Sequence, residues 1–229
     1  MKFLFWDFDG TLAFSRDNFW SNVIYDCAMK AGYDRGFEML YKKVNEGRLF
    51  SWDFKDVSYE ERVNLLWWDD FEERLSGILK ECKMDEQSAK KAVRSVRSCI
   101  LDASNYSLYE DSDWILNKAK ELGYTNIIVS NNYPELKEVM EQLGIAQYFE
   151  EFIISGQVGY EKPHRGIFEL ALKGKNPKDC WMIGDNPIAE IKDAKQFGLK
   201  TILVHREKPN ECETDFCFET LKEIEKVLS

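Results

Sequence analysis

The stretch Lys2-Phe3-Leu4-Phe5-Trp6-Asp7-Phe8-Asp9-Gly10-Thr11 is an apolar run that ends abruptly at two carboxylates. Residues 3–6 are apolar on both faces, which predicts a central strand with helices on both sides of a sheet. Asp7 and Asp9 point the same way on an extended segment, because side chains there repeat every two residues. Open α/β sheets bind ligands at the carboxyl ends of their strands. Two carboxylates this close repel each other unless a cation or a proton lies between them, so the stretch predicts an active site.

The chain of 229 residues has a formal net charge of -10. This balance argues against general affinity for nucleic acid or for an anionic membrane, because both need a basic face. The apolar run after Lys2 is too short for a signal peptide, and no stretch approaches the roughly 20 apolar residues of a membrane span. The six cysteines form no C-x-x-C pair, which favours reduced thiols. These features predict a cytoplasmic globular protein.

The segment that follows Thr11 loses the strand pattern. Its apolar residues recur at helical spacing, with no convincing strand until about residue 100. The helices expected there cover residues 17–31, 35–45, 58–81 and 85–101. We therefore expect a small all-helical domain over residues 15–101, inserted after the first strand of a domain formed by residues 1–14 and 102–229.

From about residue 109, short apolar runs alternate with helical patterns. The expected strands cover residues 126–129, 152–154, 180–183 and 201–204, and the expected helices cover residues 112–122, 134–143, 164–173 and 187–197. Alternation of this kind predicts a parallel sheet with right-handed crossovers. The predicted fold class is α/β, with a Rossmann-like, doubly wound parallel sheet and a helical insert.

Polar residues follow four of the expected strands. In chain order they are Asp7 with Asp9, Ser130-Asn131-Asn132, Lys162, and Asp185 with Glu190. In a parallel sheet these strand ends lie on one edge. Carboxylate oxygens suit Mg²⁺, whereas a lysine, a hydroxyl and helix-start amides suit a phosphate. With one aspartate left to attack, the set predicts phosphoryl transfer through an aspartyl-phosphate.

The motifs D-x-D-G-T-L, Ser130, Lys162-Pro163 and G-D-N-x-x-x-E, in this order, resemble those of the haloacid dehalogenase superfamily of phosphohydrolases. Residues 159–163, followed by Ile167-Phe168, are similar to the subfamily of phosphoglycolate phosphatases. That family inserts a helical cap after its first motif, where this chain has its helical block. The resemblance implies a Mg²⁺-dependent phosphatase that acts on a small phosphorylated metabolite, as a monomer or a homodimer.

The resemblance also implies a role for each matching residue. Asp7 would be the nucleophile and a Mg²⁺ ligand. Asp9 would be the general acid and base, with its backbone carbonyl on the metal. Asp185 would bind Mg²⁺ directly, and Glu190 would support the metal shell. The residues implied around the substrate phosphate are Thr11, Ser130, Asn131 and Lys162.

The last motif departs from the family pattern. Glu190 stands where relatives usually have aspartate, and its extra methylene allows it to act through a water molecule. Asp193 lies on the same expected helix and is a second candidate for this role, although a solvated carboxylate is the ordinary interpretation. Arg165 stands where relatives often have proline, which affects the loop more than the chemistry.

Other functions share parts of this pattern. A phosphomutase of the same superfamily uses the same pair of aspartates. A dehalogenase is disfavoured, because a halide leaving group needs no acid. A non-catalytic module that binds phosphate or Mg²⁺ for regulation is also disfavoured, because it would be expected to lose Asp7 or Asp9. The substrate stays open among phosphoglycolate, nucleoside monophosphates and sugar phosphates.

The helical block is rich in aromatic residues, namely Trp20, Phe50, Trp52, Phe54, Trp67 and Trp68. They could line a substrate pocket, but a small helical domain must also build its own core, and aromatics dominate such packing. We expect most of them to lie in a core and one or two to lie near the substrate. Arg48 is a further candidate for contact with the substrate.

Overall fold

We describe a computed structural model of the chain, which covers residues 1–15, 18–46, 49, 65–205 and 213–228. Six strands form one sheet, and every neighbouring pair of strands is parallel. The strand order is β5-β4-β1-β6-β7-β8. The strands are β1 (Lys2–Trp6), β4 (Tyr124–Ser130), β5 (Phe149–Ile154), β6 (Cys180–Gly184), β7 (Lys200–Val204) and β8 (Phe216–Phe218). The predicted α/β class with a parallel sheet is confirmed.

Strand β1 lies in the middle of the sheet, and its side chains reach both faces. Phe5 lies opposite Ile127 of β4 and Met182 of β6. Leu4 and Trp6 belong to one hydrophobic core and Phe5 to another, so the two cores occupy opposite faces of the sheet. All three side chains are fully buried. The strand is apolar on both faces for this reason.

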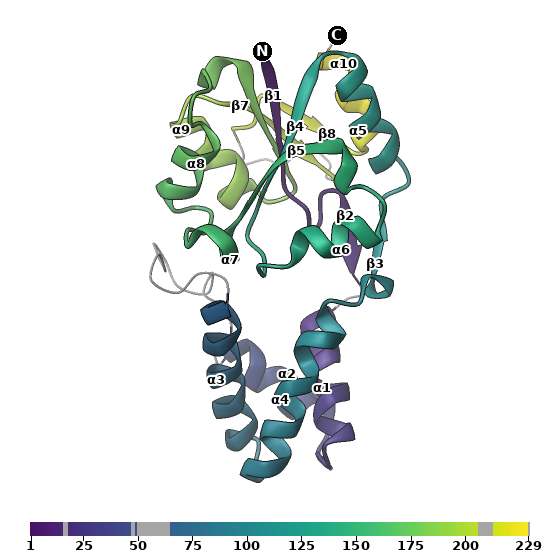
Figure 1. Ribbon diagram of the computed structural model, residues 1–229, viewed down its shortest axis with the longest axis vertical. Coiled ribbons are helices and arrows are strands. Elements are labelled where there is room, and N and C mark those ends of the chain that lie inside the picture. Colours follow the sequence, from purple (N-terminus) through teal and green to yellow (C-terminus); the bar gives the residue numbers. More distant parts are fainter. Residues whose placement is uncertain (16–17, 47–48, 50–64, 206–212, 229) are drawn as a thin grey trace.

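Helices cover both faces of the sheet (Figure 1). Helices α8 (Arg165–Ala171) and α9 (Asp193–Gln196) lie on one side, and their apolar residues join Phe5 in its core. Helices α5 (Ser112–Glu121) and α10 (Glu225–Leu228) lie on the other side, with Leu4 and Trp6. Two more short helices are α6 (Leu136–Gln142), which follows β4, and α7 (Ser155–Val158), which follows the edge strand β5. This arrangement is a doubly wound sheet.

Four helices lie within residues 19–100 of the described chain, and we call them the helical insert. They are α1 (Phe19–Lys30), α2 (Phe37–Glu46), α3 (Leu65–Glu81) and α4 (Glu86–Ile100). They lie together at the end of the molecule opposite both termini (Figure 1). Residues 58–64 of the expected third helix lie outside the described residues. None of the described helices combines the length and the apolar character that a membrane crossing needs.

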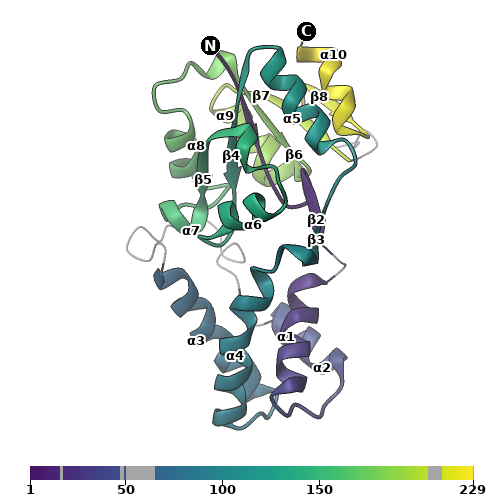
Figure 2. The ribbon, with the colours of Figure 1, turned by 45° about the vertical axis from the view of Figure 1, so that its right-hand side comes forward.

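Two short strands connect the sheet with the helical insert, and the sequence did not predict them. β2 (Ala13–Ser15) precedes the insert and β3 (Tyr106–Leu108) follows it. They pair antiparallel, with Phe14 opposite Ser107, and lie between the sheet and helices α1 and α4 (Figure 2). The insert therefore follows β2 rather than β1. Three residues are too few to show a period of two, and the pairing joins segments far apart in the chain.

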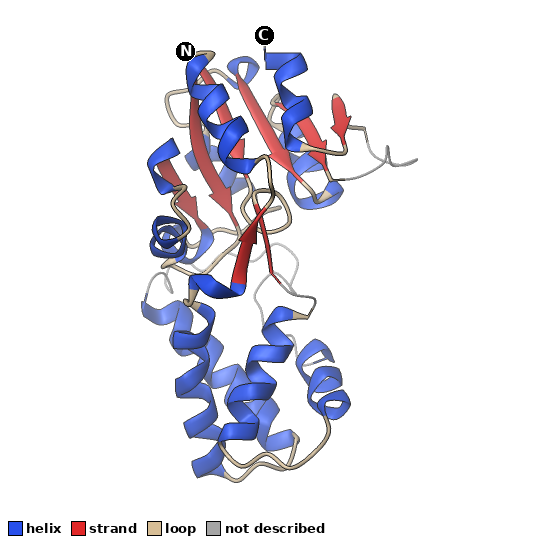
Figure 3. Ribbon diagram, turned by 90° about the vertical axis from the view of Figure 1, so that its right-hand side faces the viewer, coloured by secondary structure: helices blue, strands red, loops and turns tan. Residues whose placement is uncertain are grey.

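Three further elements differ from the sequence-based expectations. Strand β5 begins at Phe149 rather than at residue 152, and α7 occupies part of a segment expected to be a loop. Helices and strands of the described chain are distinguished by colour in Figure 3. The helix expected over 187–197 begins instead as a π-helix, Pro187–Lys192, and continues as α9. A π-helix is rare and is frequently found at functional sites. Its Glu190 is directed inward and is 3% exposed.

Candidate active site

The end of β1 brings Asp7 next to the end of β6. The Asp7 amide donates a hydrogen bond to the carbonyl of Ile183 at 3.0 Å, which continues the strand pairing by one residue. Gly10 then turns the chain with φ 76°, a conformation that favours glycine. A Cβ on Gly10 would also lie 2.7 Å from the Asp185 carboxyl carbon. Glycine at this position allows Asp7 and Asp185 to share one site.

A buried lysine joins two of the carboxylates. The Nζ atom of Lys162 lies 2.8 Å from Oδ1 of Asp7 and 3.0 Å from Oε1 of Glu190. Burial lowers the pKa of Lys162, but the charges of Asp7 and Glu190 outweigh burial, so its pKa is raised overall. The lysine is therefore charged at neutral pH.

Three carboxyl groups, two of which contact Lys162, lie close together. Asp7, Asp185 and Glu190 each offer an oxygen, and these oxygens lie within 4.8 Å of one another. Burial raises the pKa of Glu190, with Lys162 opposing and Asp7 adding to the shift. The excess of negative charge favours a cation, and carboxylate oxygens are the ligands that Mg²⁺ prefers. These residues therefore fit a Mg²⁺ ion.

Glu190 occupies a supporting position in this group. Its Oε1 contacts Lys162, and its Oε2 accepts a hydrogen bond from the Asn186 amide at 2.7 Å. A Cβ on Gly184 would lie 2.3 Å from Oε2 of Glu190, so glycine leaves room for the longer acid. Among the described residues, Asp193 is not part of the three-carboxylate group; it accepts a hydrogen bond from Gln196 at 2.9 Å.

Asn131 holds the backbone on which Lys162 is carried. Its Oδ1 accepts from the Lys162 amide at 2.6 Å, and its Nδ2 donates to the Lys162 carbonyl at 2.7 Å. The segment after β4 and the loop after β5 are thus locked together by one side chain. The sequence assigned only the Asn131 backbone to the site, so this function of its carboxamide is new.

Two buried hydroxyl groups near the ends of β1 and β4 have no hydrogen-bond partner among the described residues. They are Oγ of Ser130, at the end of β4, and Oγ1 of Thr11, in the turn after β1. A buried hydroxyl without a hydrogen bond is costly, and this pattern is expected where a ligand completes the site. The Thr11 carbonyl contacts the His205 ring at 2.8 Å, and that ring stacks on Tyr109. The sequence did not predict this anchor of the turn.

Asp9 lies outside the three-carboxylate group and has its own partner. Nδ2 of Asn132 donates to Oδ2 of Asp9 at 2.7 Å. Asp9 keeps exposed surface, yet the surrounding protein limits the hydration of its carboxylate. This desolvation, followed by the charge of Asp7, raises the pKa of Asp9 to about 7. Such a group can release and accept a proton near neutral pH.

The helical insert reaches the same segment through aromatic residues. Trp20, Trp67 and Trp68 contact the ring of Tyr133, which directly follows Asn132. Trp67 and Trp68 are buried, which confirms the expected role of these two tryptophans in packing. Phe50, Trp52, Phe54 and Arg48 lie outside the described residues.

The insert also makes a polar contact with the core, at Glu135. Nε1 of Trp68 donates to Oε2 of Glu135 at 2.8 Å, and the Arg97 guanidinium contacts Oε1 of the same carboxylate. The guanidinium also lies over the Trp68 ring, 5.3 Å from its centroid. Residues 130–135 therefore contact the lysine loop, Asp9 and the helical insert in turn.

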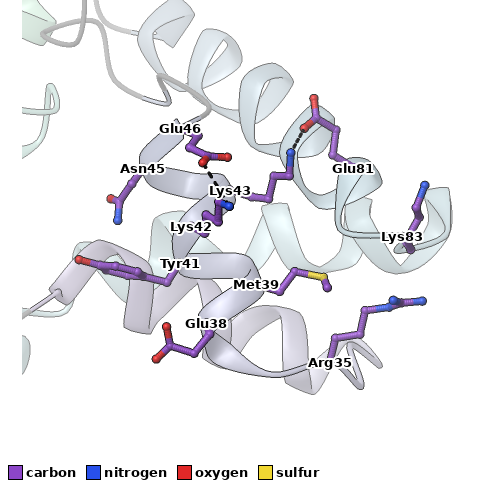
Figure 4. A pocket seen from close by; sticks show the side chains of 10 residues that line it. All are labelled: Arg35, Glu38, Met39, Tyr41, Lys42, Lys43, Asn45, Glu46, Glu81 and Lys83. Atoms are coloured by element: carbon purple, nitrogen blue, oxygen red, sulfur yellow. Dashed lines mark hydrogen bonds and ion pairs between the residues drawn. The ribbon is translucent and has the colours of Figure 1, made fainter.

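A surface hollow of about 810 Å³ lies on the insert, among α2 and the end of α3 (Figure 4). Its lining has four cationic and three anionic side chains, and two ion pairs join some of them. Lys43 contacts Glu81 at 3.2 Å, and Lys42 contacts Glu46 at 3.7 Å. None of the lining residues belongs to the site around Asp7, and the hollow presents little net charge to a ligand.

Known proteins share parts of this chain. A phosphoserine phosphatase of Thermus thermophilus is 28% identical over 144 residues, which is 61% of this chain and 57% of that enzyme. A glyceraldehyde 3-phosphate phosphatase of Methanothermobacter thermautotrophicus is 25% identical over 217 residues, 90% of this chain and 87% of that enzyme. A crystal structure of a HAD phosphatase from Thermococcus onnurineus superposes with a TM-score of 0.70 and 21% identity, over 100% of this chain and 98% of that one.

The structural likeness extends to the whole chain and so supports the fold. The Thermus relative is matched over less than two thirds of its length, so its substrate is informative only for the proposal below. The family match covers most of the chain. Residues 1–198 match the haloacid dehalogenase-like hydrolases, and the chain belongs to this family.

Proposed function

We propose that this protein is a Mg²⁺-dependent phosphatase that hydrolyses a small phosphate monoester through an aspartyl-phosphate on Asp7. One observation carries the proposal: the buried Asp7 carboxylate contacts Lys162 at 2.8 Å and shares its site with Asp185 and Glu190. A nucleophilic carboxylate needs its charge balanced and its orientation held, and these neighbours provide both. The phosphatase names of the two relatives above support the reaction type.

Each residue has a part in the proposed reaction. Asp7, Asp185 and the carbonyl of Asp9 would hold Mg²⁺, with Glu190 in support; the bound ion would neutralise phosphate oxygens. Lys162 would orient Asp7 and bind the phosphate, together with the Ser130 hydroxyl and the Asn131 amide. The unpaired hydroxyl of Ser130 is in keeping with this role.

Asp9 would move the protons. As an oxygen of Asp7 forms a bond to phosphorus, the bond from phosphorus to the leaving oxygen breaks, and Asp9 gives its proton to that oxygen. Asp9, now ionised, then takes a proton from the water that cleaves the aspartyl-phosphate. A pKa near neutrality suits both steps, and a halide leaving group would not need the first of them.

The substrate, the assembly and the location stay predictions from the sequence. We expect a small phosphorylated metabolite as substrate, a monomer or homodimer, and a cytoplasmic protein. We also propose that residues 15–101 form the cap domain and that residues 1–14 and 102–229 form the catalytic domain. The separation of the four helices of the insert from the sheet supports this division (Figure 1).

The first experiment measures phosphate release from 4-nitrophenyl phosphate and from a panel of phosphorylated metabolites, with Mg²⁺ and with EDTA. We expect release that needs Mg²⁺ and that Asp7→Asn abolishes, with the melting temperature of the variant showing that it is folded. Transfer of the phosphoryl group between positions of a sugar, without net release, would identify a phosphomutase instead. No turnover of any compound by folded protein would contradict the proposal.

A further inference from the structure

The side chain of Asn132 makes two different contacts. It is 4% exposed. Its Oδ1 accepts from the backbone amide of Tyr133 at 3.1 Å, a local contact of the kind found in turns. Its Nδ2 donates to Oδ2 of Asp9 at 2.7 Å, across 123 residues of sequence. Only the second contact reaches the reacting groups.

The backbone of Asn132 is held firmly enough to aim this donor. Its amide donates to Oγ of Ser155 at 2.9 Å, and its carbonyl accepts from that hydroxyl at 3.1 Å and from the Gly156 amide at 2.9 Å. A Cβ on Gly156 would lie 2.8 Å from the Asn132 carbonyl oxygen, so this close approach requires glycine. The direction of the Asn132 carboxamide is therefore set by the start of α7, before any substrate binds.

The chemistry of a carboxamide decides which oxygen of Asp9 carries the proton. An amide NH₂ group donates and cannot accept, whereas a protonated carboxyl group has one O–H donor, and its carbonyl oxygen is its stronger acceptor. Because Asn132 donates to Oδ2, Oδ2 is favoured as the carbonyl oxygen of neutral Asp9. The proton of neutral Asp9 is therefore favoured on Oδ1.

We propose that Asn132 is a positioning residue for proton transfer by Asp9: it holds Oδ2 and leaves Oδ1 as the oxygen that exchanges protons. This inference rests on the proposed phosphatase function. In the first step the Oδ1 proton moves to the leaving oxygen as the bond from that oxygen to phosphorus breaks and the bond from Asp7 to phosphorus forms. In the second step Oδ1 accepts a proton from the attacking water. In this role Asn132 acts through Asp9.

Two variants separate this role from a purely local one. Asn132→Ala removes both contacts of the side chain. Asn132→Asp keeps the shape and an oxygen that accepts from the Tyr133 amide, but it loses the donor and places a like charge beside Asp9. A residue that only shapes the turn would tolerate the aspartate, whereas a residue that positions Asp9 would not.

Two aryl esters of similar shape report on the proton transfer. 4-Nitrophenolate is a weak base and leaves without help, whereas phenolate needs a proton from a general acid. The experiment measures kcat/KM for 4-nitrophenyl phosphate and phenyl phosphate with saturating Mg²⁺, because kcat/KM includes departure of the leaving group but not the later hydrolysis. For phenyl phosphate we expect both variants to lose about 10- to 100-fold, and for 4-nitrophenyl phosphate at most about threefold. KM should change much less than kcat.

Several results would overturn the proposal. One is an equal loss of kcat/KM for both esters in the variants. Another is an Asn132→Asp variant whose ratio of kcat/KM for the two esters equals that of the wild type. If Asn132→Ala fails to fold in a thermal melt, Asn132→Asp alone decides, because it preserves the local contact. If the wild-type protein with Mg²⁺ hydrolyses neither ester nor any metabolite, the phosphatase function itself is wrong and the positioning role is wrong with it. If the wild type hydrolyses the esters but the loss of kcat/KM in the variants is the same for both leaving groups, only the positioning role is wrong.

Discussion

At the scale of single residues, the site is organised by an imbalance of charge. Among the described residues, Lys162 contacts both Asp7 and Glu190, and Asp185 adds a third carboxylate. A buried group of this kind is stable only if a further positive charge or a proton joins it. This excess of negative charge favours a metal ion, and the proposed function depends on that ion.

The structure separates the two acids that the sequence left as alternatives. Glu190→Gln weakens the support of the metal site, so we expect the Mg²⁺ concentration for half-maximal phosphate release to rise about 10- to 100-fold, as is usual for residues behind metal ligands. Asp193→Asn, a matched change on the following turn, should leave it unchanged. Titration of activity with Mg²⁺ measures both variants. If only Asp193→Asn raised this Mg²⁺ concentration, Asp193 and not Glu190 would support the metal site.

The protonation of Asp9 gives a second prediction at this scale. Its pKa rises from 3.8 in an unperturbed chain to about 7 in the folded protein, so the folded state favours the proton. This contribution to stability is fully present below pH 3.8 and is lost as the pH rises to about 7. We therefore compare the melting temperatures of Asp9→Asn and the wild type in EDTA. The variant's advantage should grow between these pH values and level off above them. A difference independent of pH would show that Asp9 has an ordinary pKa.

At the scale of elements, the edge of the sheet depends on a side chain outside any strand. Asp215 directly precedes β8, and its Oδ2 accepts from the amide and the hydroxyl of Thr201 in β7 at 2.8 and 2.9 Å. Lys195 of α9 contacts its other oxygen at 3.2 Å. Burial raises the pKa of Asp215, but the hydrogen bonds from Thr201 and Lys195 outweigh it and lower the pKa below 3.8. One carboxylate thus joins β7, β8 and α9.

We expect Asp215→Asn to lower the free energy of unfolding at pH 7 by on the order of 1 kcal/mol, since Asp215 is exposed and solvent weakens its contacts. A lowered pKa stabilises the folded state above the unfolded pKa, and this stabilisation is lost as the pH falls through the folded value. The difference should therefore shrink below about pH 3.8. Urea unfolding at several pH values measures it, with the exposed Glu213→Gln as the control. A pH-independent difference would contradict the assignment.

At the scale of the whole molecule, residues 130–135 connect the parts that must act together. Asn131 holds the lysine loop, Asn132 contacts Asp9, and Tyr133 and Glu135 contact the helical insert. The Glu135 side chain is 15% exposed and accepts hydrogen bonds from residues of α3 and α4. One short segment therefore contacts the helical insert, Asp9 and the lysine loop.

Removal of this contact should loosen the insert from the sheet. Glu135→Ala leaves the Trp68 indole N–H and the Arg97 guanidinium without their shared acceptor, and we expect a loss of about 2 to 3 kcal/mol in the free energy of unfolding. Glu138→Ala, an exposed acid on the adjoining turn, should cost less than about 0.5 kcal/mol. Chemical denaturation measures both. Equal effects would show that Glu135 contributes no more than a surface residue.

The sequence predicted most of the sheet because its evidence was local. The strands of the core are apolar runs bounded by glycines and acids, and the helices between them show a clear period. Strands β2 and β3 and helix α7 were missed, since they have only three or four residues each. Their existence depends on pairing with distant segments or on the loop around them, which no local pattern encodes.

The amino-acid sequence by itself determined the fold class and which residue types meet at the sheet edge, because alternation and strand-end acids are properties of neighbouring residues. Only the tertiary structure decided how these residues are used. It joined Asn131 to Lys162, Asn132 to Asp9 and Glu135 to Trp68, and it excluded Asp193 from the three-carboxylate group. These contacts join residues that are far apart in the sequence. Such residues come within hydrogen-bond distance only when the two cores are packed.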